Sequence, residues 1–246
     1  MTSEKFCYTR IRMDTHKELH GNSFAARLNS LRAGVLGAND GIVSMAALLV
    51  GVAGANVSSH ALLVTGVAGL IAGALSMAVG EYVSVSSQRD SETSLLEKER
   101  HELVHEADKE LEELTHIYQK KGLKRDTAHQ VALELTLHDA FTAHVEAELG
   151  IDPNDLTNPL DASVASAVAF TLGGVIPLLA ITMPPAAYCI PATFAAVLVA
   201  LILTGILSAK MSDTSMRKVT FRVVSGGILA MITTFGIGNL LGVSAV

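Results

Sequence analysis

The hydrophobic positions of this chain form five long runs, and a polar, acidic segment separates the second run from the third. Each run is close to the ~20 helical residues needed to cross the apolar core of a bilayer. We expect helices, because a spanning helix satisfies its own backbone hydrogen bonds, whereas barrel strands would be short and alternating. The sequence therefore predicts an all-α membrane protein with five transmembrane helices, at residues 33–55, 61–83, 163–182, 190–209 and 223–244.

The polar segment, called here the acidic insert (residues 91–158), differs sharply from the rest of the chain. Fourteen of the 24 acidic residues and six of the nine histidines lie between Ser91 and Gly150. Only 17% of the whole chain is charged, compared with about 25% in an average soluble domain. One part of the chain is thus suited to lipid and the other to water. We divide the chain into an N-terminal segment at 1–32, spans at 33–90, the insert, and spans at 159–246.

Lysine and arginine are distributed unevenly among the links between the spans. They precede the first span and occupy the link between the fourth and fifth, whereas the links at 56–60 and 183–189 contain neither. Because these residues favour the cytosolic side, we expect the N-terminus, the insert and the last link in the cytosol. The membrane would be the inner membrane of a bacterium or the vacuolar membrane of a eukaryote. A net charge of −6, without a basic patch, argues against a nucleic-acid partner.

The insert is predicted to be a bundle of three helices. Residues 95–121 have the apolar periodicity of one long helix, and 126–137 and 137–149 predict two shorter ones. Five glutamates on the long helix would fall within an arc of about 80°. Divalent cations would relieve their repulsion, but a solvated acidic face with nearby lysines explains the spacing equally well. The glutamates are Glu99, Glu102, Glu106, Glu110 and Glu113, and His138, His144 and Glu148 of the following helices could add ligands.

Carboxylates also occur within the apolar runs. Asp40 lies inside the first span and Glu81 near the cytosolic end of the second. A carboxylate is costly in lipid and usually faces a pathway, although Glu81 could instead reach water at the interface. Met77 lies one turn before Glu81, and a thioether beside a carboxylate suits a borderline divalent metal. Asn39 and Met45 could add ligands to this path, but core packing explains Met45 more simply.

Two of these stretches resemble the signatures of a known family. Arg32-Ala-Gly-Val-Leu-Gly-Ala-Asn-Asp-Gly-Ile-Val-Ser44 is similar to the first-helix signature of the vacuolar iron transporter family, and residues 73–84 are similar to its second-helix signature. The resemblance implies a homodimer with a cytosolic three-helix metal-binding domain, which exports Fe²⁺, and also Mn²⁺, in exchange for protons. It assigns Asp40 and Met77 to the translocation path. It assigns to the metal domain Glu99, Glu102, Glu110, Glu113 and Glu148, with Glu106 an additional ligand.

The chain departs from the family pattern at two places. Gly69 stands where the plant iron transporters carry a glutamate, eight residues before Met77, and Glu81 stands where they carry glycine. The pathway carboxylate would then lie nearer the cytosol. In the metal domain, His144 and Val145 replace a methionine pair, so an imidazole would replace thioether ligands.

We therefore expect a proton-coupled exporter of Fe²⁺ and Mn²⁺ rather than an enzyme, without a permanently bound cofactor. Zn²⁺, Co²⁺ and Ni²⁺ are further candidate ions. The sequence contains no nucleotide-binding loop and no catalytic triad. A membrane-anchored iron store or sensor is an alternative, although an anchor has no use for Asp40 and Glu81. A ferritin-type oxidase would need paired Glu-x-x-His motifs, and only Glu102 with His105 fits that spacing.

Overall fold

The computed structural model describes residues 24–153 and 156–243, and all regular structure within these ranges is helical. This confirms the predicted all-α class. Residues 1–23 of the expected N-terminal segment, and Ser244 at the end of the fifth predicted span, lie outside the described residues. The elements in order are α1 (Phe24–Gly54), α2 (Ser59–His105), α3 (Ala107–Lys120), α4 (Arg125–His144), the π-helical segment η2 (Val145–Leu149), α5 (Pro159–Thr182), α6 (Cys189–Met211) and α7 (Met216–Val243).

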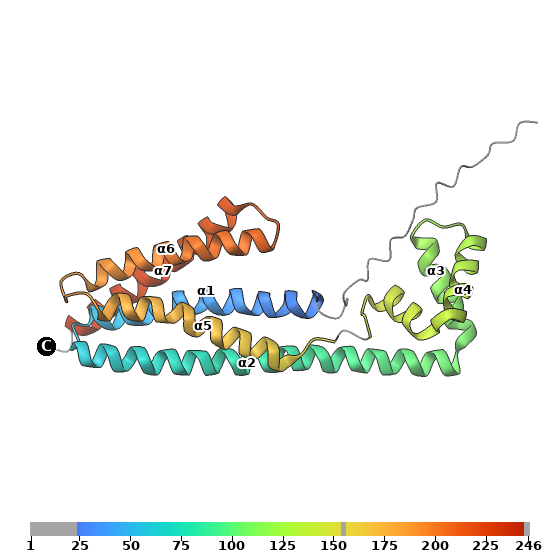
Figure 1. The fold of residues 1–246 in the computed structure, drawn as a ribbon, viewed down its shortest axis with the longest axis horizontal. Coiled ribbons are helices and arrows are strands. Elements are labelled where there is room, and N and C mark those ends of the chain that lie inside the picture. The colour runs from blue at the N-terminus through green and yellow to red at the C-terminus, as the bar shows by residue number, and fades with distance from the viewer. Residues whose placement is uncertain (1–23, 154–155, 244–246) are drawn as a thin grey trace, which may run out of the picture.

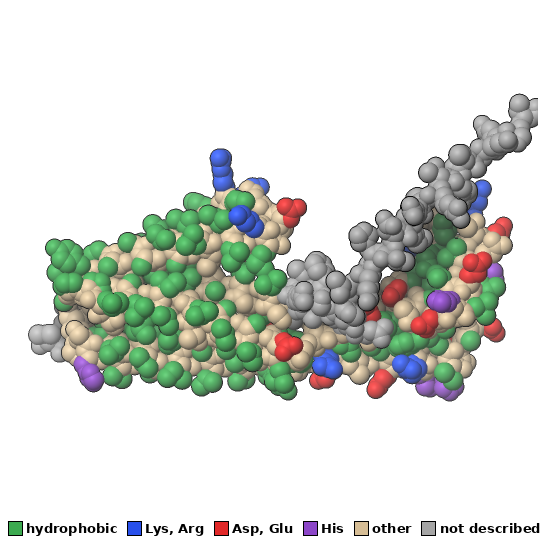
Figure 2. All heavy atoms as spheres, in the orientation of Figure 1, with side chains coloured by type: hydrophobic (Ala, Val, Ile, Leu, Met, Phe, Trp, Pro, Cys, Tyr) green, Lys and Arg blue, Asp and Glu red, His purple; other side chains and the backbone are tan. Residues whose placement is uncertain are grey.

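Five helices, α1, α2, α5, α6 and α7, are long and apolar enough to cross a membrane. They lie side by side as one bundle (Figure 1). Hydrophobic side chains cover the visible surface of this bundle, whereas most charged side chains gather over the insert and at the link between α6 and α7 (Figure 2). The starts of α1 and α5, the insert, and the α6–α7 link all lie at the same end of the bundle (Figure 1).

Helix α1 is the central element of the bundle, since it contacts each of the other four long helices. Its closest neighbour is α5, and glycines on both helices allow this approach. A Cβ atom added at Gly37 or Gly41 would collide with the backbone of α5, and one added at Gly173 would collide with the backbone of Ala38. Large apolar side chains fill the remaining space, among them Ile42, Leu49, Phe170, Leu201 and Met231.

Helix α2 is continuous over 47 residues, so the second span and the first helix of the insert are one element. The predicted single helix at 95–121 is therefore wrong. The chain leaves the helix at Glu106, which has φ −132° and ψ 35°, and α3 starts at the next residue. In Figure 1, α3 rises steeply away from the axis of α2. The break was not predicted because neither glycine nor proline marks it.

The two shorter helices predicted for the insert are present, but they adjoin at Asp139 rather than at residue 137. Asp139 has non-helical angles (φ −157°, ψ 93°) and kinks α4. Its carboxylate accepts hydrogen bonds from the Thr142 backbone N–H (3.1 Å) and hydroxyl (2.8 Å), and so caps the helix that follows. Gly150, with φ +65°, ends this helix in a left-handed conformation that glycine adopts without strain.

The close packing of α1 on α5 leads to a stability prediction. Gly173→Ala should lower the free energy of unfolding by about 1–3 kcal/mol, because the new methyl group has no room against the backbone of Ala38. Gly236→Ala is the matched control, since a Cβ at that position meets nothing within 4 Å. Thermal unfolding of the detergent-purified variants measures the difference. Equal midpoints for the two variants would contradict this account of the helix contact.

Candidate metal centre

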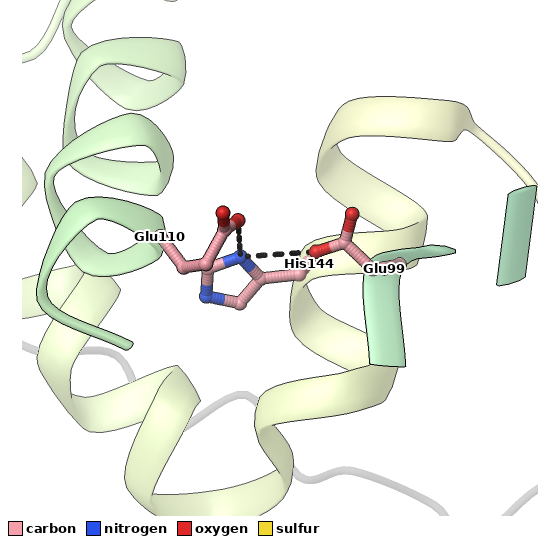
Figure 3. Close-up of side chains that lie close together, drawn as sticks. All are labelled: Glu99, Glu110 and His144. Atoms are coloured by element: carbon pink, nitrogen blue, oxygen red, sulfur yellow. Dashed lines mark ion pairs between the residues drawn. The ribbon is translucent and has the colours of Figure 1, made fainter. Parts of the chain in front are cut away.

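Three buried side chains from three different helices meet inside the insert. Glu99 of α2 is 2% exposed, Glu110 of α3 is 6% exposed and His144 of α4 is 1% exposed. The Nδ1 atom of His144 lies 3.5 Å from Glu99 Oε1 and 3.8 Å from Glu110 Oε2 (Figure 3). One ligand atom from each residue falls within 4.8 Å of the other two. The fold-back at Glu106 and the kink at Asp139 produce this convergence.

These separations are at or beyond the limit of a hydrogen bond and are close to the spacing of donor atoms around one divalent ion. Metal–ligand bonds of about 2.0–2.2 Å place neighbouring donor atoms about 3–3.6 Å apart. Glu99 Oε1 is buried and has no hydrogen-bond partner in the described structure. A buried acceptor without a partner is costly, and a cation would satisfy it. Two carboxylates and one imidazole form a donor set for borderline ions such as Fe²⁺ and Zn²⁺, and also for Mn²⁺.

A second set of ligands adjoins the first and shares Glu110 with it. Ligand atoms of Glu110, Glu113 and Glu148 also lie within 4.8 Å of one another. Glu113 and Glu148 are exposed, so this outer set faces solvent. All of its donors are carboxylate oxygens, which favour harder ions such as Mn²⁺. The insert thus combines a buried mixed centre with an exposed oxygen-only set.

The carboxylates of the centre hold protons more tightly than free glutamates do. Burial, and then the charges of Glu148 and Glu110, raise the pKa of Glu99 from 4.5 to about 7. Burial likewise raises the pKa of Glu110, and partial desolvation together with the charge of Glu113 raises the pKa of Glu148 although its side chain also reaches solvent. A hydrogen bond joins the carboxyls of Glu99 and Glu148. Burial lowers the pKa of His144, so its imidazole is neutral and able to bind metal at pH 7. An incoming ion therefore has to displace protons from carboxyl groups.

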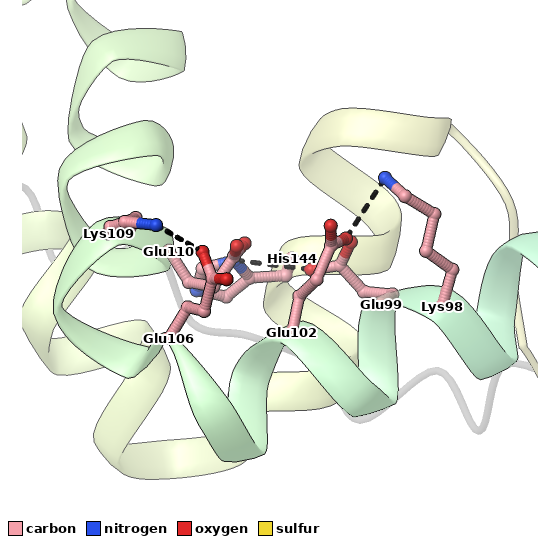
Figure 4. Close-up of polar contacts among 7 residues, drawn as sticks. All are labelled: Lys98, Glu99, Glu102, Glu106, Lys109, Glu110 and His144. Carbon is pink, nitrogen blue, oxygen red and sulfur yellow. Dashed lines mark hydrogen bonds and ion pairs between the residues drawn. The ribbon is translucent and has the colours of Figure 1, made fainter.

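Two of the predicted ligands lie at or beyond the rim of the centre. Glu102 pairs with Lys98 at 3.1 Å along the side of α2 (Figure 4). Glu106 sits at the helix break, where it is exposed and pairs with Lys109 at 2.6 Å (Figure 4). The expected stripe along one helix is replaced by two Glu-x-x-Glu pairs on α2 and α3. The predicted ligand His138 is exposed, as are three other histidines of the insert, namely His101, His105 and His116.

Within the bundle, three of the predicted pathway residues line a single cavity. Asn39 and Asp40 of α1 and Met77 of α2 face a space of about 550 Å³. The oxygen of the Asn39 side chain is buried without a hydrogen-bond partner in the described structure. Arg222 of α7 also lines the cavity. By sequence Arg222 is one of the basic residues of the link before the fifth predicted span, and only its place directly ahead of residue 223 hints that it could reach the bundle.

The other two predicted pathway residues lie elsewhere. Glu81 is one turn beyond Met77, and its side chain lies 3.9 Å from the guanidinium of Arg32. Met45 is 2% exposed in the core of the bundle. Its sulfur lies 3.6 Å from the position of a Cβ built on Gly69. Met45 thus helps to fill the space beside Gly69.

The fold has five helices able to cross a membrane, and the insert holds side chains placed so that they could bind a divalent ion. The chain belongs to the VIT family, which it matches over residues 31–239, and this confirms the family predicted from its motifs. It is 43% identical over 234 residues to a vacuolar iron transporter from Acanthamoeba castellanii, covering 95% of this chain and 85% of the relative. Vacuolar iron transporter homolog 1 from Oryza sativa subsp. japonica is 36% identical over 227 residues, with coverages of 92% and 80%.

The pKa shifts lead to a prediction about protons released on metal binding. Glu99 is largely protonated at pH 6 and ionised at pH 8, so Mn²⁺ should release more protons per ion at pH 6. Glu99→Gln should reduce this release, whereas Glu97→Gln, a change at an exposed glutamate of α2, should not. Titration in weakly buffered detergent solution with a pH electrode measures it. Proton release that is independent of pH between 6 and 8 would show that the metal-free centre is already ionised.

The same shift has a consequence for stability. Between pH 4.5 and about 7 the folded metal-free protein binds more protons at Glu99 than the unfolded chain does. The free energy of unfolding of the metal-free protein therefore falls as the pH rises from 4.5 through about 7. The stability associated with protonated Glu99 is fully present below pH 4.5 and is lost above about pH 7.

Proposed function

We propose that this chain transports Fe²⁺ out of the cytosol in exchange for protons, with Mn²⁺ as a second substrate, and that it is not an enzyme. The observation that carries the proposal is the cavity of the bundle, where Asp40 and Met77 from two different helices face the same space. A carboxylate and a thioether at membrane depth are the chemistry expected of a transition-metal pathway. The names of the relatives, vacuolar iron transporters and their homologues, support iron as the cargo.

The insert would lie in the cytosol together with the N-terminus. The basic residues at the end of α6 and the start of α7, among them Lys210 and Lys218, belong to the end of the bundle where the insert lies (Figure 1). The opposite links carry no lysine or arginine. This arrangement agrees with the preference of basic residues for the cytosolic side. In a eukaryotic cell the membrane would be that of the vacuole, in keeping with the names of the relatives.

In this mechanism the insert collects metal and the bundle conducts it. Glu99, Glu110 and His144 bind the ion. When they release it, the ion becomes available to the cytosolic end of the path through the bundle. Glu81, held near Arg32, forms the first carboxylate of the path, and Asp40 and Met77 form the next ligands. Protons from the far side then compete with metal for the Asp40 carboxylate, because both bind the same oxygen lone pairs. Zn²⁺, Co²⁺ and Ni²⁺ would fit the same donors.

The working unit would be a homodimer. Asn39, Asp40 and Met77 are only partly buried within the single chain. The second span is the least buried of the five, with 11% of its apolar window inside the protein. A second copy against this face would shield the intramembrane carboxylate from lipid. The mass of the detergent-purified protein, measured by light scattering, tests this part of the proposal.

The decisive variant of the transport proposal is Asp40→Asn. It removes the charge but keeps the shape, so flux of Fe²⁺ and Mn²⁺ into proteoliposomes under a pH gradient should fall at least about tenfold, equivalent to roughly 1.4 kcal/mol of barrier. Asp213→Asn is the matched control, because it makes the same change in the α6–α7 link, where a φ of 47° suits asparagine.

Metal entry and internal pH are followed in the same vesicles. Coupled metal and proton movement in the wild type, lost in Asp40→Asn and kept in Asp213→Asn, supports the exchanger. Undiminished flux in Asp40→Asn would remove Asp40 from the pathway. Tight metal binding without any flux in the wild type would favour the membrane-anchored store or sensor instead.

A further inference from the structure

The last turn of α2 carries two histidines that the proposed transport path does not use. His101 and His105 are four residues apart and therefore lie on the same side of the helix. Their rings stack with centroids 4.0 Å apart and planes inclined by 18°. Both side chains are exposed to solvent. The stack brings the two imidazoles next to each other, and a turn of the His101 ring out of the stack would direct one of its nitrogens toward an ion bound at His105.

The orientation of one ring is fixed by the backbone. His105 Nδ1 lies 2.8 Å from the carbonyl oxygen of His101, which can only accept a hydrogen bond. The proton of a neutral His105 ring is therefore on Nδ1, and Nε2 retains its lone pair. Metal-binding histidines in proteins commonly have this arrangement, in which one ring nitrogen donates to a carbonyl and the other binds the ion.

This pair is separate from the buried centre. Glu99 and His101 are two residues apart on α2, so they project about 200° apart around the helix. Glu99 is buried, whereas both histidines face solvent. A carboxylate is nevertheless close by, at Glu106. Its pKa is lowered first by its contact with Lys109, and in addition by the proximity of His101 and His105.

We propose that His101 and His105 form a second metal-binding site, which takes ions that favour imidazole, namely Zn²⁺, Ni²⁺ and Cu²⁺. Nε2 of His105 and one ring nitrogen of His101 supply the protein ligands. Water, or the Glu106 carboxylate once released from Lys109, completes the coordination shell. Paired histidines at a spacing of four residues hold zinc on the helices of many metalloproteins. Mn²⁺ prefers oxygen donors, so it distinguishes this site from the outer carboxylate set.

The five residues His101-Glu-Leu-Val-His105 also match the His-Glu-x-x-His pattern of zinc hydrolases. In those enzymes the glutamate acts as a base toward a metal-bound water. Here Glu102 is paired with Lys98 at 3.1 Å (Figure 4). The site therefore binds metal but lacks an available base, and we assign it no catalytic activity.

The test uses purified full-length protein in detergent, with Ni²⁺ as the probe. The parent for every comparison is Glu99→Gln/Glu110→Gln, which removes the buried centre and leaves the histidine pair. In this background His101→Ala/His105→Ala is compared with His116→Ala/His138→Ala, a matched loss of two exposed histidines elsewhere in the insert. Isothermal titration gives the stoichiometry, and circular dichroism verifies equal helix content.

The parent and the control should each bind one equivalent of Ni²⁺ that the His101→Ala/His105→Ala protein has lost. His105→Ala alone should weaken Ni²⁺ binding at least about tenfold, because one exposed imidazole is a weak ligand. Mn²⁺ binding to the protein with an intact centre should not change on removal of the pair. Equal Ni²⁺ binding by the His101→Ala/His105→Ala protein and by the control overturns the proposal. Absence of Ni²⁺ binding by the parent also overturns it. Neither result depends on transport, so this test leaves the proposed transport function to be judged by the flux experiment.

Discussion

The unbroken backbone hydrogen bonding of α2 from Ser59 to His105 is the constraint on which the rest of the structure depends. Met77 and Glu81 lie in its membrane half and Glu99 and Glu102 in its distal half. One wall of the metal centre is therefore fixed to the membrane span without a hinge. A straight continuation of the helix would have placed Glu110 about 16 Å beyond Glu99 along the axis. The break at Glu106 allows α3 to turn, and the two carboxylates become neighbours.

The centre shows how burial and like charge are balanced. Two buried carboxylates would be strongly destabilising if both were ionised, since charges removed from water need partners. Here the raised pKa of Glu99, and its hydrogen bond to Glu148, keep a proton in the cluster when metal is not bound. The neutral imidazole of His144 adds a donor without adding charge. A metal ion and a proton are thus alternative means of neutralising the same cluster.

The sequence was sufficient for the features that depend on local pattern. Apolar runs of bilayer length predicted the long helices, and the first-helix motif predicted the family. The break at Glu106 was not predictable, because its residues are all compatible with a helix and the gain from breaking it lies in tertiary contacts. For the same reason the glutamates were expected on one helix face, whereas Glu99 meets Glu110 across two helices. The packing of Met45 beside Gly69 could not be predicted from the sequence either, because it depends on how α1 and α2 pack.

The length of α2 also determines how the candidate metal centre of the insert and the carboxylates of the membrane bundle can influence each other. Glu81 and Glu99 are separated by 18 residues of continuous helix, or about 27 Å. Counter-ions in the cell screen exposed charges beyond about 8 Å. The field of the insert therefore hardly reaches Glu81, and in the proposed mechanism an ion released from the insert would have to diffuse through water to arrive there. In the proposed transport cycle the insert would therefore act as a reservoir that steadies the supply of ions, and the selection among them would be made by the membrane residues.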